Sequence, residues 1–111
     1  MNEQELSDHI GRIHLINKTW KLMSERYGPD SPLTLALKNR KSSLQVELLR
    51  LSAGRAWLQR DLETPGVEPL FSVRFDSALS DRLSGRKDAD HLPVRVAEEL
   101  LTDNELKGVL R

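Results

Sequence analysis

The first 27 residues carry a seven-residue repeat of apolar side chains, which constrains the fold more than any other feature of the sequence. The members of the repeat are Leu6, Ile13, Trp20 and Tyr27. Seven residues make nearly two turns of α-helix, so the pattern predicts an amphipathic helix from about Glu3 to Tyr27. Three more apolar residues, Ile10, Leu15 and Leu22, widen the stripe. We therefore expect this helix to pack in a bundle or in an intertwined dimer.

The size and composition indicate one soluble domain over residues 1–111. The chain has no cysteine and no apolar run near the roughly 18 residues of a membrane span, and its polar start does not resemble a signal peptide. We therefore expect a cytoplasmic protein without disulfides or membrane contact. Only 38% of the residues are hydrophobic, so a monomer would have a thin core, which favours association with a second chain.

Helix-breaking residues separate the first helix from a second one. Gly28 and Pro29 end the first helix, because glycine tolerates the left-handed end of a helix and proline cannot continue it. Ser31 and Pro32 begin the second helix, because serine caps a helix and proline fits its first position.

The segment that follows, residues 32–63, fits two different helical arrangements. In the first, the polar run 39–43 is a loop and Ser52 starts a further helix over 53–63, which gives the outline of a helix-turn-helix. In the second, one long helix continues through both places. The sequence leaves both arrangements open.

Residues 70–111 begin with a short extended segment and end in helices. Phe71, Val73 and Phe75 alternate with polar residues, which is typical of a strand. A lone strand over 70–75 has to pair with its copy in another subunit or lie across the helices. The rest is predicted to hold a short helix up to Gly85, a mobile loop over 86–91, a helix over 93–101 and a capping box at Thr102 and Glu105. These predictions make the chain all-α, apart from one strand-like segment.

The sequence offers little for catalysis or for metal binding. Its three histidines, His9, His14 and His91, lack the spacing of three or four residues that would place two of them on one helical face toward a zinc ion. The sequence has no glycine-rich phosphate loop and no serine in a nucleophile elbow. We therefore expect no enzyme activity, no cofactor, no metal ion and no small-molecule substrate.

A basic stretch in the middle of the chain is the strongest pointer to a partner. From Lys38 to Arg60 there are six basic residues and one acidic residue, although the whole chain has no net charge. Such a stretch suits a surface that faces phosphate groups, and it equally suits a solvated helix face. In the helix-turn-helix arrangement, Arg55 and Arg60 lie on the second helix, where side chains reach the major groove of DNA.

Two groups of residues resemble the FlhD family of flagellar transcriptional activator subunits. They are Glu5-Leu6, His9-Ile10, Ile13 and Leu15 in the first helix, and the later run Val73-Arg74-Phe75-Asp76-Ser77. The resemblance covers most of the chain and implies a mostly helical, intertwined homodimer that joins a zinc-bearing FlhC-type partner on promoter DNA. The family's Phe-Arg pair is replaced by Ala36-Leu37-Lys38-Asn39, and its frequent cysteine is absent. These departures suggest a divergent relative, such as one carried by a mobile element.

The leading hypothesis is therefore a DNA-associated transcriptional activator subunit that acts as a dimer with an FlhC-like protein. Its predicted DNA contacts are Lys38, Arg40, Lys41, Arg55 and Arg60, and its predicted dimer interface holds Leu6, Ile10, Ile13, Leu15 and Trp20. The alternative is a helical adaptor or antagonist that binds a protein through the apolar face of the first helix and does not touch DNA.

Overall fold

The computed structural model describes residues 3–52, 54–61, 68–76 and 91–111. Its elements, in chain order, are α1 (Glu3–Tyr27), α2 (Pro32–Leu51), β1 (Ala56–Asp61), β2 (Leu70–Phe75), β3 (His91–Pro93), α4 (Val94–Leu100) and α5 (Asp103–Val109). Most described residues are helical, as predicted, but the all-α class is wrong because three strands form a small antiparallel sheet. The short helix predicted up to Gly85 lies outside the described residues.

α1 and α2 form a hairpin whose turn is fixed by its own hydrogen bonds. Gly28 has a φ of 92°, a conformation that favours glycine, and its N–H donates to the carbonyl of Ser24 (3.0 Å). Ser31 caps α2 by accepting from the N–H of Thr34 (3.2 Å), and the hydroxyl of Thr34 donates to the carbonyl of Gly28 (2.9 Å). The predicted turn, with Ser31 as cap and Pro32 at the start of the helix, is confirmed.

α2 crosses the polar run 39–43 without a break, so the loop predicted there is wrong. Two residues inside the run, Lys41 and Ser42, are buried. Tertiary packing therefore holds this part of the chain in a helix, and it outweighs the weak local helix propensity.

α2 then ends at Leu51, which makes both the helix-turn-helix and the single long helix wrong. The N–H and the hydroxyl of Ser52 both donate to the carbonyl of Leu48, and Gly54 has a φ of 85°, so the chain leaves the helical path. The residues that follow form β1, because their buried side chains alternate in the way that a strand needs.

The sheet has the order β1-β2-β3, with both pairs antiparallel. The predicted strand over 70–75 is confirmed as β2, and its partners are two strands of the same chain. Leu58 lies opposite Val73, and Phe71 lies opposite Leu92, so these four side chains share one face. They are buried in one core with residues from three of the helices, including Leu6, Ile10, Leu48, Leu49 and Ala97.

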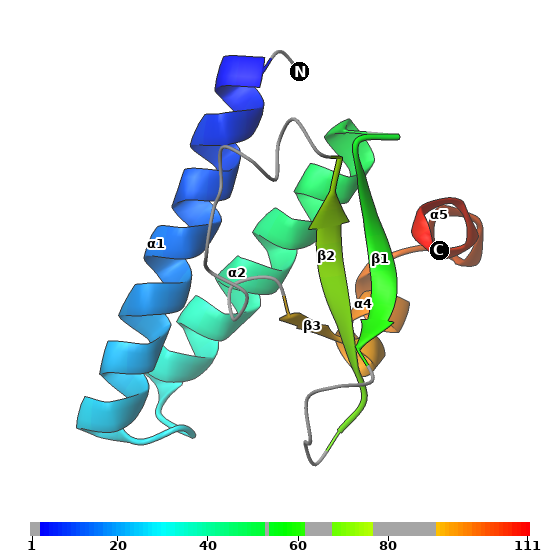
Figure 1. Ribbon diagram of the computed structural model, residues 1–111. Coiled ribbons are helices and arrows are strands. Elements are labelled where there is room, and N and C mark those ends of the chain that lie inside the picture. The colour runs from blue at the N-terminus through cyan, green and yellow to red at the C-terminus, as the bar shows by residue number, and fades with distance from the viewer. Residues whose placement is uncertain (1–2, 53, 62–67, 77–90) are drawn as a thin grey trace.

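The C-terminal helix α5 lies beside β1, at the far end of the sheet from α1, and α4 packs against α2 and β3 (Figure 1). α4 confirms the helix predicted over 93–101, and the predicted capping box is present. The N–H of Glu105 donates to Thr102 Oγ1 (3.1 Å), and the N–H of Thr102 donates to Glu105 Oε1 (3.0 Å). Within the described ranges, none of the helices combines the length and the apolar character that crossing a membrane requires.

Candidate functional site

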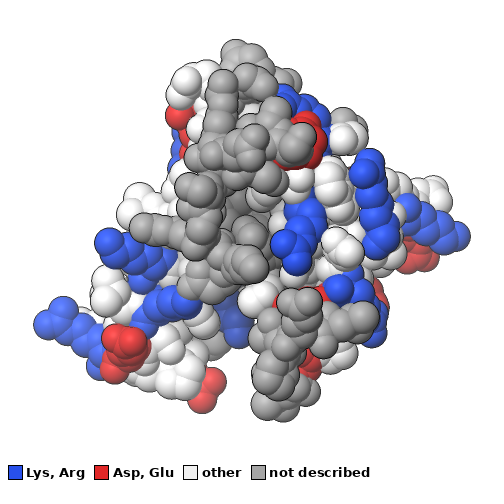
Figure 2. Space-filling model, in the orientation of Figure 1, with Lys and Arg blue, Asp and Glu red and all other residues white. Residues whose placement is uncertain are grey.

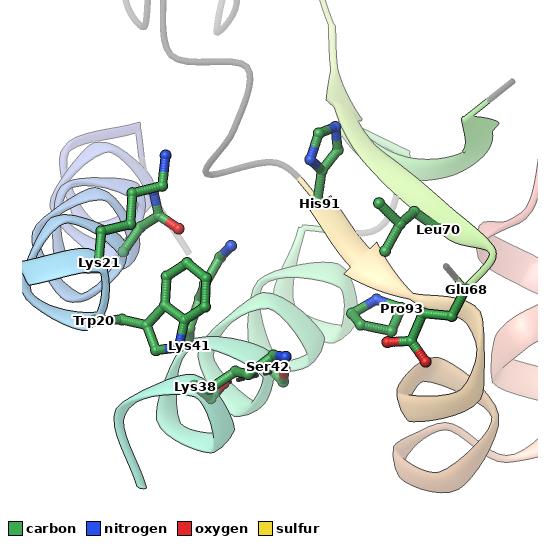
Figure 3. Close-up of a pocket in the computed structure, with 10 residues that line it drawn as sticks. Trp20, Lys21, Lys38, Lys41, Ser42, Glu68, Leu70, His91 and Pro93 are labelled. Carbon is green, nitrogen blue, oxygen red and sulfur yellow. Dashed lines mark hydrogen bonds between the residues drawn. The ribbon is translucent and has the colours of Figure 1, made fainter. Parts of the chain in front are cut away.

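A pocket of about 320 Å³ lies between the α1–α2 hairpin and the part of the sheet formed by β2 and β3. We call it the Trp20 pocket, and its lining residues are Asn17, Trp20, Lys21, Lys38, Lys41, Ser42, Glu68, Leu70, His91 and Pro93. Figure 3 shows the indole of Trp20 on one side of the space, with Leu70, His91 and Pro93 on the other. The volume falls within the range of pockets that hold a small ligand or one chemical group of a larger ligand.

Two lysines of α2 are gathered around the ring of Trp20. The ammonium nitrogen of Lys38 lies 5.8 Å from the ring centre, and that of Lys41 lies 6.0 Å from it. The two residues are one helical turn apart, so their charges repel each other, whereas the negative face of the indole attracts both. Lys41 is only 9% exposed, and its aliphatic stem adds to the apolar part of the lining. The arrangement places positive charge beside an aromatic wall.

The opposite wall is held in place by polar side-chain contacts and by the sheet. His91 Nε2 lies 3.0 Å from Asp61 Oδ2, an interaction that spans β2, since β1 and β3 lie on either side of that strand. The side-chain amide of Gln45 donates to the carbonyl of His91 (3.1 Å), which ties this wall to α2. Glu68 is the one acidic residue among the described lining, and its carboxylate pairs with Arg95 at 3.5 Å.

Two buried polar atoms at the pocket have no hydrogen-bond partner in the described part of the chain. They are Oδ1 of Asn17, an acceptor, and Nε1 of Trp20, a donor. Buried polar groups in proteins are nearly always hydrogen bonded, so two unpaired ones at a single pocket require an explanation. Both atoms have almost no accessible surface, so they lie in the packed wall of the pocket and not at its open space.

The structure brings together only two of the five residues predicted to contact DNA. Lys38 and Lys41 both line the Trp20 pocket. Arg40 is exposed and lies roughly 200° around α2 from Lys38, because two helical positions separate them. Arg55 lies in the turn before β1 and is held in an ion pair of 2.7 Å, and Arg60 is an exposed residue of β1. The five residues lie on α2, on the turn before β1 and on β1, and not on the helix-turn-helix that was predicted to unite them.

Three of the five residues predicted at the dimer interface are buried within one chain. Leu6, Ile10 and Ile13 belong to the core and are at most 3% exposed. Trp20 is half-buried at its pocket, and only Leu15, at 63% exposure, lies open on the outer face of α1. The burial of the first three needs no second copy, so on α1 only the outer face is open to another chain.

Sequence reasoning did not identify the wall opposite Trp20. Its residues belong to β2 and β3, far along the chain from Trp20, and no local pattern marks them as neighbours of α1. His91 is predicted in a mobile loop, which is wrong, because it is the first residue of β3 and pairs with Ser72. The sequence did contain a signal for the near side of the pocket. Trp20 and Lys21 are adjacent on the first helix, and two lysines lie three residues apart on the second helix.

Comparison of the chain with protein-family models, with curated proteins and with solved structures finds no match. In the ranges that the structure describes, no three His, Cys, Asp or Glu side chains lie close enough together to hold a metal ion. The function is therefore argued from the Trp20 pocket itself.

Proposed function

We propose that this protein is a non-catalytic, DNA-associated regulatory subunit that holds a phosphate group at the Trp20 pocket. The observation that carries the proposal is the pair of ammonium groups of Lys38 and Lys41, which both lie within 6.0 Å of one indole ring. Lysine is a common ligand of phosphate, and attraction to the ring offsets part of the repulsion between the two charges before an anion binds.

Further basic side chains extend along the hairpin. Residues 18–41 include six basic and two acidic residues. Among the described residues, no ion pair engages Lys18, Arg26 or Lys38. Figure 2 shows Lys and Arg side chains over both the hairpin and the sheet on one face of the molecule. Positive charges that form no ion pair with the described residues are available to neutralise DNA phosphates.

The resemblance to the FlhD family adds an FlhC-type partner and a homodimer to this proposal. Because the described residues between Pro32 and Asp61 form a helix and a strand in place of the predicted helix-turn-helix, we assign base recognition in the duplex to the partner. The present chain contributes phosphate contacts, which set position and affinity but do not by themselves read the sequence.

A second candidate function is the helical adaptor that binds a protein and not DNA. The observation that favours it is the exposure of two leucines on the outer face of α1, Leu15 at 63% and Leu22 at 53%. They lie seven residues apart and therefore on one stripe of the helix.

The test is a salt titration of DNA binding, followed by fluorescence anisotropy of a labelled duplex, with and without a co-expressed FlhC-like protein. The affinity of the wild-type chain is expected to fall steeply with salt, because phosphate neutralisation releases counterions. Lys38→Met is expected to reduce the slope of log K against log salt by about 1. Arg40→Met is the matched control, and it is expected to leave the slope unchanged because Arg40 lies on another side of α2.

Two results would contradict the proposal: binding that does not change between low and moderate salt, and equal effects of Lys38→Met and Arg40→Met. A chain that never engages DNA with any partner, but captures a protein through Leu15 and Leu22, would support the adaptor instead.

A further inference from the structure

A second pocket, of about 400 Å³, lies between the end of α2, the start of β1 and α5. We call it the Arg111 pocket, and the exposed or partly exposed residues around it include Arg50, Trp57, Glu105, Gly108, Val109 and Arg111. Leu49, Ala56 and Leu101 also line it, but they are at most 4% exposed and form its packed base. The volume falls within the range of pockets that hold a small ligand.

The guanidinium of Arg111 is held in place while its N–H groups stay unused. Its Cζ lies 4.3 Å from the centre of the Trp57 ring, and the backbone N–H of Arg111 donates to the carbonyl of Leu58 (2.9 Å). Stacking uses the face of a guanidinium and leaves the N–H groups, which lie in its plane, for an anion. No ion pair or side-chain hydrogen bond within the described ranges engages this group.

The charges around the Arg111 pocket favour an anion. Arg50 and Glu105, the one acidic residue of the described lining, pair with each other at 2.7 Å, so their charges offset. Arg74 lies opposite Trp57 in the register of β1 with β2 and therefore on the same face of the sheet. It is exposed, and none of the described residues pairs with it. The positive charge of Arg111 is therefore left without a counterion.

We propose that the Arg111 pocket binds a free small organic acid, with its carboxylate at Arg111 and its apolar body against Trp57 and Val109. A planar guanidinium binds a carboxylate through two parallel hydrogen bonds. Trp57 and Val109 are partly exposed, so they offer apolar surface that a ligand can reach. An inorganic anion would leave that surface in water, whereas an apolar body covers it. The ligand is bound and not converted, and the inference does not depend on the DNA association proposed for the Trp20 pocket.

The experiment compares benzoate with its neutral amide, benzamide, by isothermal titration calorimetry with the full chain. Benzoate is expected to bind at least about tenfold more tightly, because a hydrogen bond between two charged groups is stronger than one to a neutral group. Arg111→Gln is expected to lower the affinity for benzoate to that for benzamide. Arg12→Gln, which removes an exposed charge from α1, is the matched control and should leave both affinities unchanged.

A substitution of Gly108 locates the site within the molecule. Gly108 and Gly11 lie in helices, and neither has a heavy atom within 4 Å of an added Cβ. Leucine also favours a helix over glycine, so both leucine variants should fold, and circular dichroism checks this. Gly108→Leu places a side chain at the Arg111 pocket and is expected to abolish binding of benzoate. Gly11→Leu, on α1, is expected to leave it unchanged.

Three results would overturn the inference. The first is equal affinity for benzoate and benzamide, or no binding of benzoate. The second is binding of benzoate that survives both Arg111→Gln and Gly108→Leu. The third is loss of benzoate binding in Lys38→Met without any change in Gly108→Leu, which would place the acid at the Trp20 pocket. The salt titration tests DNA association separately, so either proposal can fail without the other.

Discussion

Asn17 is a polar residue in a place where an apolar residue would give a more stable protein, and the buried residue Lys41 lies at the same pocket. Asn17 is 5% exposed with an unpaired amide oxygen, and Lys41 is 9% exposed with its ammonium group near the indole of Trp20. A buried amide oxygen without a hydrogen bond costs free energy of folding. Sites of this kind are where stability and function compete. Both residues line one pocket, which agrees with a function there.

A stability measurement on Asn17→Leu tests this interpretation at the level of one residue. We expect the free energy of unfolding to rise by about 1 kcal/mol, because the substitution removes an unsatisfied polar group and leaves no cavity. Urea denaturation followed by circular dichroism measures the change. Asn39→Leu, on the exposed side of α2, serves as the control and should stay within about 0.5 kcal/mol of wild type. A loss of stability in Asn17→Leu would mean that the oxygen has a partner in the folded chain.

Helices and strands that are determined by residues close together in the sequence were predictable. Those that depend on contacts between distant parts of the sequence were not. The seven-residue repeat defines α1, and Ser31 and Thr102 mark helix starts by their own hydrogen bonds. β1 was not predictable, because Leu58 continues a helical repeat from Leu51 as well as it alternates with Ala56. Pairing with β2 makes this segment a strand and not a helix, because tertiary pairing outweighs local propensity in such segments.

The same division applies to the candidate site. The basic stretch correctly pointed to Lys38 and Lys41, which lie on one helix at a spacing that the sequence shows directly. The wall formed by Leu70 and Pro93 depends on the antiparallel register of β2 with β3. A single sequence contains no local signal for that register.

The effect of Gly54→Ala on stability distinguishes the observed turn from the two predicted helical arrangements. The sign of the change in the free energy of unfolding differs between them. In a helix interior, Gly54→Ala would stabilise the chain, because alanine favours the helix by about 1 kcal/mol over glycine. In the structure Gly54 has a φ of 85° and no neighbour near an added Cβ, so the backbone alone is strained. We therefore expect a loss of about 1 kcal/mol in the free energy of unfolding, measured by urea denaturation. A gain in stability would argue for a helix through this position.

The contact between α2 and α5 predicts how stability depends on pH. Arg50 Nε lies 2.7 Å from Glu105 Oε2, and its Nη2 donates to the carbonyl of Leu100 (2.9 Å). The hydrogen bond from Arg50, helped by the N–H of Thr102, lowers the pKa of Glu105 from 4.5 to about 2. Because the pKa of Glu105 is lowered in the folded state, its ionised carboxylate stabilises the fold fully at a pH above the pKa of the unfolded chain. This stabilisation is lost as the pH falls from about 4.5 toward 2.

Glu105→Gln is expected to lower the melting temperature at neutral pH, because glutamine keeps the capping hydrogen bond but loses the ion pair with Arg50. The difference from wild type should shrink as the pH falls below about 4.5 and vanish only below about pH 2, where most of the wild-type carboxyl is also protonated. Thermal unfolding at a series of pH values, followed by circular dichroism, measures it. A difference that is constant over this range would show that the charge of Glu105 does not contribute.

For the molecule as a whole, the two faces of α1 have different roles. The inner face is buried in the chain's own core through Leu6, Ile10 and Ile13. The outer face carries Leu15 and Leu22, which are exposed and seven residues apart. Dimerisation stays a prediction, and we now expect it at the outer face of α1, because the inner face is buried in the chain's own core. An intertwined core is not needed to bury the apolar stripe of α1.

An antiparallel second copy would place Leu15 of one chain against Leu22 of the other. It would also bring Asp8 near Arg26 of the second copy, and no ion pair in the described part of the chain engages either residue. Opposite charges beside an apolar stripe favour this pairing over a parallel one.

Size-exclusion chromatography with light scattering tests the predicted dimer. We expect Leu15→Glu to give a monomer with unchanged helical content, because the substitution places a charge in the proposed interface and nothing polar in the core. Leu33→Glu, which changes an exposed leucine of α2 outside the stripe, is the matched control and should remain a dimer. Ile13→Asp cannot serve, because Ile13 is buried within one chain and its substitution would unfold a monomer and a dimer alike. A wild-type chain that is monomeric at every concentration, or a Leu15→Glu variant that stays dimeric, would exclude the outer face of α1 as the interface.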